Sequence, residues 1–234
     1  MKKKSLKALL PQIAIRLFFI WVIVIFSFAM KKPFADKANG NSPSYLALGD
    51  SYTIGEQVTT KENFPHQLSL MIGSSEPTVI AQTGWTTDEL SAAIGQSRID
   101  QSFDLVTLLI GVNNQYRGRT VSDYVPQFES LLKQAIKFAG NNPKHVIVLS
   151  IPDWGVTPFA EGRDRNLIAR QIDAFNSANE SVAKNYGVHY INITDSTRQA
   201  TYDPSLLAAD GLHPSGKEYA IWAKKAADLV HEKM

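Results

Sequence analysis

Short apolar runs alternate along the chain with longer segments in which apolar and polar residues recur at helical spacing. The short runs are apolar or β-branched at consecutive positions, so both of their faces would be buried, as in the strands of a parallel sheet. This pattern predicts five strands, at Tyr45–Leu48, Thr78–Gln82, Leu105–Ile110, His145–Ile151 and Val188–Ile193.

The longer segments between these runs have the period of amphipathic helices. Residues 122–139, 166–186 and 215–230 each place a stripe of apolar side chains on one helical face. Two helix starts carry the capping-box pattern, a hydroxyl side chain followed three residues later by glutamate. They are Thr86 with Glu89, and Ser215 with Glu218.

Together these elements predict an α/β fold with one parallel sheet between two layers of helices. Crossovers between parallel strands are right-handed, so a doubly wound three-layer α/β/α sandwich is the simplest arrangement. Ligands in such folds bind beyond the carboxyl ends of the strands. In the strand order 2-1-3-4-5, the loops after the first three strands would meet at that edge.

The first 35 residues have the pattern of a targeting segment. A basic stretch precedes an apolar run of 14 residues at 17–30, which is shorter than the ~20 residues that span a membrane. This favours a cleaved signal peptide. Counted back to Ile13, the run gives the alternative of a retained N-terminal membrane anchor. Residues 36–43 form a polar linker, and residues 44–234 are predicted to be one domain outside the cytoplasm.

Charge and cysteine content exclude several classes of function. Residues 1–35 hold seven of the 24 lysines and arginines and no acidic residue, so 17 basic residues face 22 acidic ones in the remainder. That excess of negative charge argues against nucleic acid as a partner. The absence of cysteine excludes disulfides and a thiolate nucleophile. The remaining histidines lack partners at ligand spacing, so we predict neither a metal nor a cofactor.

Residues suited to nucleophilic catalysis follow the predicted strands. Ser51 comes directly after the first strand, in Gly49-Asp50-Ser51. A serine hydroxyl attacks well only when a base removes its proton, and His213 near the C-terminus is the candidate base. Asp210, three residues earlier, could fix the tautomer of the imidazole and stabilise the imidazolium.

An oxyanion requires hydrogen-bond donors, and the second and third loops offer them. The backbone N–H groups of Ser51 and Gly84 are suitable, and the side-chain amide of Asn113 could add a third donor. The same loops contain residues that could line an acyl or sugar pocket: Trp85, Tyr116, Arg117, Arg119, Asp153 and Trp154. Arg117 and Arg119 would favour an anionic substrate if they faced the site.

In this order the motifs resemble those of the SGNH (GDSL-type) hydrolase superfamily, over about Tyr45 to Val230. Its four name-giving residues would be Ser51, Gly84, Asn113 and His213. The resemblance implies a flavodoxin-like sheet and hydrolysis of esters or thioesters without a metal. One departure is Asn114, where the family's third block, G-x-N-D, has an acid. We interpret it as a change in local support or in substrate contact.

The sequence therefore predicts an exported serine esterase that acts through an acyl-enzyme on a small-molecule, glycan or lipid ester. A carbohydrate O-deacetylase and a lysophospholipase or thioesterase share these motifs and stay open as alternatives. A catalytically silent binding module, attached to a membrane by the N-terminal segment, is the alternative from another class. A flavodoxin-like nucleotide binder is disfavoured, because no glycine-rich phosphate loop follows the first strand.

Overall fold

The computed structural model describes residues 42–234. The predicted signal peptide or anchor, and all but the end of the predicted linker, lie outside the described residues. Within residues 42–234, no helix is both long and apolar enough to cross a membrane.

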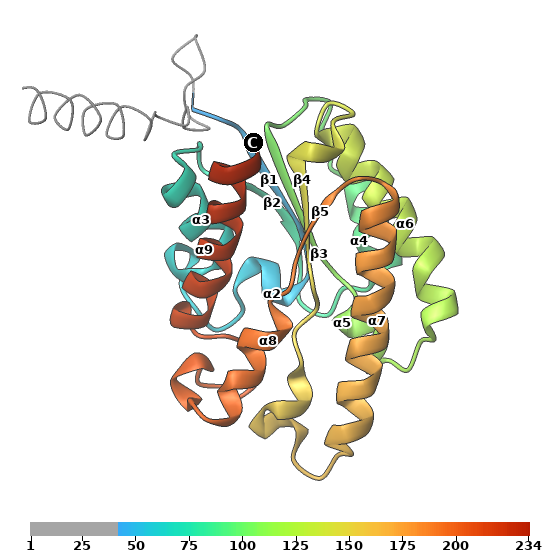
Figure 1. Ribbon diagram of the computed structural model, residues 1–234, viewed down its shortest axis with the longest axis vertical. Helices are drawn as coiled ribbons and strands as arrows, with labels where there is room; N and C mark the ends of the chain where they lie inside the picture. The colour runs from blue at the N-terminus through green and yellow to red at the C-terminus, as the bar shows by residue number, and fades with distance from the viewer. Residues whose placement is uncertain (1–41) are drawn as a thin grey trace, which may run out of the picture. The chain divides into compact units, whose positions relative to one another are not determined.

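Five parallel strands form one sheet in the order β2-β1-β3-β4-β5 (Figure 1). The doubly wound α/β prediction and its strand order are therefore confirmed. Strand β1 lies between β2 and β3, with Leu46 paired to Thr78 on one side and to Val106 on the other. The strands are β1 Tyr45–Gly49, β2 Thr78–Ala81, β3 Leu105–Leu109, β4 Val146–Leu149 and β5 His189–Ile191.

Helices cover both faces of the sheet (Figure 1), with α3 and α9 in one layer and α4, α6 and α7 in the other. The α-helices are α2 Ser51–Ile54, α3 Phe64–Ile72, α4 Thr87–Gln96, α5 Val112–Tyr116, α6 Val121–Phe138, α7 Arg165–Asn185, α8 Thr194–Thr197 and α9 Gly216–Lys233. Short 3-10 turns lie at Thr60–Glu62, Pro143–His145, Trp154–Val156, Pro158–Ala160, Arg198–Thr201 and Pro204–Leu206.

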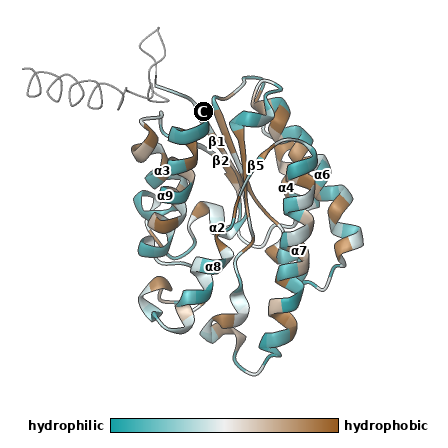
Figure 2. Ribbon diagram, in the orientation of Figure 1, coloured by the Kyte–Doolittle hydropathy of each residue, from teal (hydrophilic) through white to brown (hydrophobic). Residues whose placement is uncertain are grey.

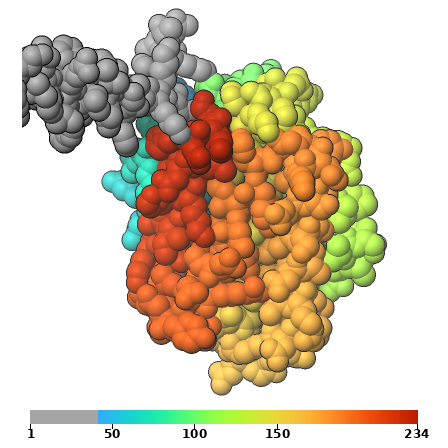
Figure 3. Space-filling model, in the orientation of Figure 1, coloured from blue at the N-terminus to red at the C-terminus, as the bar shows by residue number. Residues whose placement is uncertain are grey.

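The hydrophobic core is built around the strands in the middle of the sheet. Every residue of β1, β3 and β4 is buried, whereas the edge strand β2 is half-buried along its length. Figure 2 shows apolar residues concentrated in the strands, between helices whose outer faces are hydrophilic. In the space-filling view, the C-terminal third of the chain covers most of the face toward the reader (Figure 3).

Two local predictions need correction. The sequence patterns assigned no helix to Phe64–Ile72, yet α3 forms there and packs against α9. The predicted capping box at Ser215 is only half formed. The Ser215 hydroxyl accepts a hydrogen bond from the Glu218 N–H, but the Glu218 carboxylate accepts from Trp222 Nε1 and Ser196 Oγ instead of capping the helix.

The physical reason is burial. Trp222 is fully buried, and its indole N–H must find an acceptor inside the protein. Glu218 at position i−4 is within reach and is itself only 1% exposed. At the other predicted box the expected geometry is present, since Glu89 Oε2 accepts from the Thr86 N–H at 2.8 Å.

Candidate active site

Ser51 is the first residue of α2, where the chain turns sharply after β1. The turn is possible because Gly49 has no side chain: a Cβ there would lie 2.0 Å from Thr53 Oγ1 and 2.4 Å from the Leu109 carbonyl oxygen. Asp50 caps the helix, with Oδ1 accepting from the Tyr52 N–H at 3.0 Å. The serine is thereby held at the carboxyl end of β1 and is itself buried.

Asp210 and His213 lie in a tight turn that is closed by backbone pairing at its base. The Ala208 N–H donates to the His213 carbonyl at 2.8 Å, and the Ser215 N–H donates to the Leu206 carbonyl at 2.8 Å. Inside the turn, Asp210 Oδ1 accepts from the N–H groups of Leu212 and His213, both at 3.0 Å. One carboxylate oxygen therefore shapes the turn, which leaves the other oxygen for the imidazole.

The three predicted catalytic side chains lie in one hydrogen-bonded row. His213 Nε2 is 3.1 Å from Ser51 Oγ, and His213 Nδ1 is 2.6 Å from Asp210 Oδ2. Partial burial alone would raise the pKa of Asp210. The hydrogen bonds from His213 and Leu212 outweigh that effect and hold the pKa below its ordinary value. An ionised Asp210 favours the tautomer with the proton on Nδ1, so that Nε2 can accept a proton from Ser51.

The predicted oxyanion donors line the same cavity as Ser51 and His213. Gly84 has a φ of +82°, which glycine adopts without strain. Within the described residues, neither the Ser51 N–H nor the Gly84 N–H donates a hydrogen bond to the protein. Asn113 Nδ2 donates to the Trp85 carbonyl at 3.0 Å, and its contact to Asp50 Oδ2 is long, at 3.4 Å. An oxyanion would therefore compete with Asp50 Oδ2 for the second hydrogen of this amide.

Asp50 is a buried acid directly beside this site. Burial raises its pKa to about 7, although hydrogen bonds from the Tyr52 N–H and the Asn113 amide lower it. The folded protein therefore keeps a proton on Asp50 at pH values where the unfolded chain, with a pKa near 3.8, has lost it.

This difference predicts a pH-dependent stability that Asp50→Asn removes. Between about pH 4 and pH 7 the unfolded state binds fewer protons, so stability falls as pH rises, by at most about 1.4 kcal/mol per pH unit from this group. The asparagine side chain imitates the protonated acid and cannot titrate. Urea unfolding of both proteins across that range should give a wild-type curve that falls relative to the variant curve. Parallel curves would contradict the prediction.

Asn114 is fully buried, which rules out contact with a substrate. Its Nδ2 donates to Thr87 Oγ1 at 2.7 Å, and its Oδ1 accepts from the Thr87 N–H at 3.1 Å. Because the amide both donates and accepts, it joins the start of α5 to the first turn of α4. An aspartate could not donate in this way, so the departure from G-x-N-D is one of local support.

The cavity beside Ser51 has a volume of about 170 Å³. Of the six residues predicted to line a pocket, Tyr116 and Trp154 do so, together with Phe159, which the sequence did not single out. The residues Tyr116 and Phe159 are 44% and 43% exposed and form the rim of the cavity. Phe159 lies in a 3-10 turn after β4, and only its aromatic character in a segment between predicted elements could have signalled it.

Arg117 and Arg119 do not line the cavity. Arg117 pairs with Glu89 at 3.1 Å and Arg119 with Asp88 at 2.6 Å, both on α4. The expectation that these two guanidinium groups favour an anionic substrate therefore has no support in the geometry.

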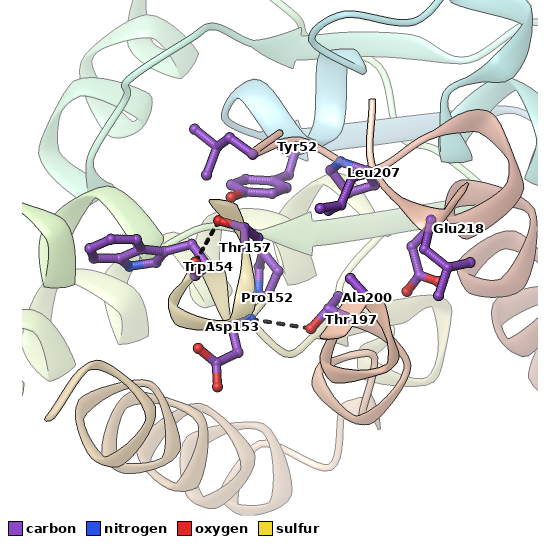
Figure 4. Close-up of a pocket in the computed structure, with 12 residues that line it drawn as sticks. Tyr52, Pro152, Asp153, Trp154, Thr157, Thr197, Ala200, Leu207 and Glu218 are labelled. Atoms are coloured by element: carbon purple, nitrogen blue, oxygen red, sulfur yellow. Dashed lines mark hydrogen bonds between the residues drawn. The ribbon is translucent and has the colours of Figure 1, made fainter. Parts of the chain in front are cut away.

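A second hollow lies under Tyr52 and is too small for a substrate (Figure 4). Its volume is about 10 Å³, near the lower limit for a single water molecule. Tyr52 and Trp154 contribute to both hollows, and the Tyr52 ring packs against His213 at 5.1 Å between centroids. Among residues 42–234, no group of three or more His, Asp or Glu side chains could hold a metal ion.

A serine, an imidazole and a carboxylate in a row beside free amide donors, on a doubly wound sheet, define the class of α/β serine ester hydrolases. The chain belongs to the GDSL-like lipase/acylhydrolase family, whose profile matches residues 47–221. This confirms the SGNH-type resemblance, which rested on motifs at Ser51, Gly84, Asn113 and His213. A comparison with curated protein sequences finds no significant match.

Solved structures show the same fold at low sequence identity. A lipolytic protein of the G-D-S-L family from Veillonella parvula is 18% identical with a TM-score of 0.62, covering 79% of this chain and 96% of its own. The acetylxylan esterase Axe2 from Geobacillus stearothermophilus is 16% identical with a TM-score of 0.64, covering 81% and 94%. A lipase/acylhydrolase from Enterococcus faecalis is 21% identical with a TM-score of 0.59, covering 81% and 96%.

Proposed function

We propose that this protein is an exported serine esterase that hydrolyses short-chain carboxylic esters through an acyl-enzyme. The observation that carries the proposal is the row in which Ser51 Oγ lies 3.1 Å from His213 Nε2 and Asp210 Oδ2 lies 2.6 Å from Nδ1. A catalytically silent module has no need of such a row. The proposal that the protein is exported rests on the sequence of residues 1–35, which lie outside the described residues.

In the first half-reaction, Ser51 Oγ attacks the ester carbonyl while His213 Nε2 takes the hydroxyl proton. The carbonyl oxygen becomes an oxyanion, which the Ser51 N–H, the Gly84 N–H and the Asn113 amide stabilise. The C–O bond to the alcohol then breaks, and His213 returns the proton to the leaving oxygen. Asp210 holds the imidazolium in place throughout.

In the second half-reaction, water attacks the acyl-enzyme carbonyl and gives a proton to His213. The tetrahedral intermediate collapses, the bond to Ser51 Oγ breaks, and the proton returns to the serine. The products are the carboxylic acid and the free enzyme, so no external redox partner is required.

The size of the cavity supports a short acyl group. Its volume of about 170 Å³ is small beside the ~300–1,000 Å³ of pockets for drug-sized ligands. In a long apolar pocket, each additional methylene group of the acyl chain would contribute about 0.8 kcal/mol of binding free energy. In a short pocket, only the first few carbons of the chain are buried, so longer chains bind no more tightly.

A series of p-nitrophenyl esters tests this proposal. We expect kcat/KM to be highest for acetate to butyrate, and lower by about tenfold or more for octanoate and palmitate. Rates that rise steadily to palmitate would contradict the short pocket and favour the lysophospholipase or thioesterase alternative.

The rim favours carbohydrate O-deacetylation as the second candidate. Tyr116 and Phe159 are both partly exposed at the mouth of the cavity, with ring centroids 6.1 Å apart. The Arg163 guanidinium lies over the Tyr116 ring, 5.3 Å from its centroid, which leaves Phe159 as the ring that can pack on a sugar. The similar fold of an acetylxylan esterase is in keeping with this candidate. Release of acetate from acetylated xylan, faster than from p-nitrophenyl acetate at equal ester concentration, would select it.

A further inference from the structure

Two side chains, one in α5 and one directly after it, hold the turn that follows β2. Asn113 Nδ2 donates to the Trp85 carbonyl at 3.0 Å, and Arg117 Nη2 donates to the Gly84 carbonyl at 2.6 Å. Because Asn113 and Arg117 are four residues apart, they lie on the same face at α5. Consecutive carbonyls of the turn are thereby bound by α5 and by the residue that ends it.

Gly84 needs such an external constraint. With a φ of +82° and no side chain, its backbone has wide conformational freedom. A donor in an oxyanion hole must nevertheless point in a fixed direction before the reaction begins. The hydrogen bond at the Gly84 carbonyl restricts rotation about the residue, and so restricts where its own N–H points.

Arg117 is itself fixed from the other side. Its Nη1 is 3.1 Å from Glu89 Oε1, while Glu89 Oε2 caps α4 through the Thr86 N–H at 2.8 Å. The planar guanidinium thus joins the first turn of α4 to the Gly84 carbonyl through two different nitrogens. A lysine ammonium is a point charge on a flexible stem and does not reproduce this planar bridge.

We propose that Arg117 is a positioning residue of the oxyanion hole, which acts by fixing the Gly84 backbone in line with the Asn113 amide. This inference rests on the proposed function, since it assigns Arg117 to the same site. Arg117 does not touch the reacting atoms. It lowers the barrier only by holding a donor in the direction that the transition state requires.

Arg119 supplies a matched control within the same loop. It also pairs with an acid in the first turn of α4, with Nη1 at 2.6 Å from Asp88 Oδ1, but it bonds to no residue of the turn after β2. Arg117→Ala and Arg119→Ala therefore each remove an ion pair to the first turn of α4. Only the first variant releases the Gly84 carbonyl.

The experiment compares Arg117→Ala, Arg117→Lys and Arg119→Ala with the wild type on p-nitrophenyl acetate. Thermal unfolding of each variant monitors the fold.

For Arg117→Ala we expect kcat to fall about 10- to 100-fold with KM changed by less than about threefold, because the donor is misdirected, not lost. Affinity for phenylboronic acid, which forms a tetrahedral adduct with the serine, should fall by a similar factor. Arg117→Lys should restore only part of kcat, and Arg119→Ala should stay within about twofold of wild type.

Equal effects of Arg117→Ala and Arg119→Ala on kcat and on boronate affinity would overturn the inference, since a general support of α4 would then explain both. Ser51→Ala separates this failure from failure of the proposed function. If hydrolysis depends on Ser51 but not on Arg117, only the positioning role is wrong. If wild-type hydrolysis does not depend on Ser51, both proposals are overturned.

Discussion

Ser51→Ala is expected to lower kcat for p-nitrophenyl acetate by at least about 10⁴-fold and to abolish covalent labelling by a fluorophosphonate probe. Both results follow from the position of the Ser51 hydroxyl, 3.1 Å from His213 Nε2. The probe forms its bond with an activated serine oxygen, which alanine lacks. The residual rate would come from oxyanion donors and substrate binding alone.

Thr53→Val is the matched control for this loss. Thr53 is fully buried two residues from Ser51, and its hydroxyl has no hydrogen-bond partner within the described residues. Valine has nearly the same shape, so labelling and kcat should stay close to those of the wild type. Labelling that survives Ser51→Ala would identify another nucleophile. A folded wild-type protein that neither labels nor hydrolyses esters would be the silent binding module.

Asp210→Asn is expected to lower kcat by about 10³- to 10⁴-fold while the turn around it stays intact. The introduced asparagine can still accept from the N–H groups of Leu212 and His213 through its carbonyl oxygen. Its NH₂ group would then face His213 Nδ1, at the place where a carboxylate oxygen now lies at 2.6 Å. A donor there favours the tautomer with hydrogen on Nε2, which cannot take the proton from Ser51.

Steady-state kinetics and the rate of fluorophosphonate labelling would measure this effect. Asp203→Asn is the control, because Asp203 also shapes a turn, through the Ser205 N–H at 3.1 Å, and pairs with Lys217 on the surface. We expect that variant to stay within about twofold of wild type. If Asp210→Asn remained within tenfold of wild type, the carboxylate would have no part in orienting the imidazole.

The periodic pattern of the chain predicted the larger elements well. The long helices begin and end within a few residues of their predicted bounds, as with α6 at Val121–Phe138 against the predicted 122–139. The short elements were harder. In α3, Phe64, Leu68 and Ile72 repeat at helical spacing between Asn63 and Gly73, a signal that was present but brief. The five residues of α5 are too few to show a period.

Tertiary contacts overrode local patterns at several single residues. Glu218 fits a capping box but is drawn inward by the buried indole of Trp222. Arg117 and Arg119 looked available for a substrate, yet each is held by an acid on α4, far away in sequence. Such partners come together only through folding, so a local reading of residue types cannot assign them.

By itself, the sequence determined the alternation of strands and helices, the doubly wound fold class and the set of residues capable of serine chemistry. These follow from short-range rules: the periods of strand and helix, and the handedness of parallel crossovers. Only the tertiary structure decided that Ser51 and His213 lie within hydrogen-bond distance across 162 positions, and which guanidinium holds Gly84. Distances of that kind depend on how the helix layers pack on the sheet, and every buried side chain contributes to that packing. Local sequence patterns therefore cannot predict them.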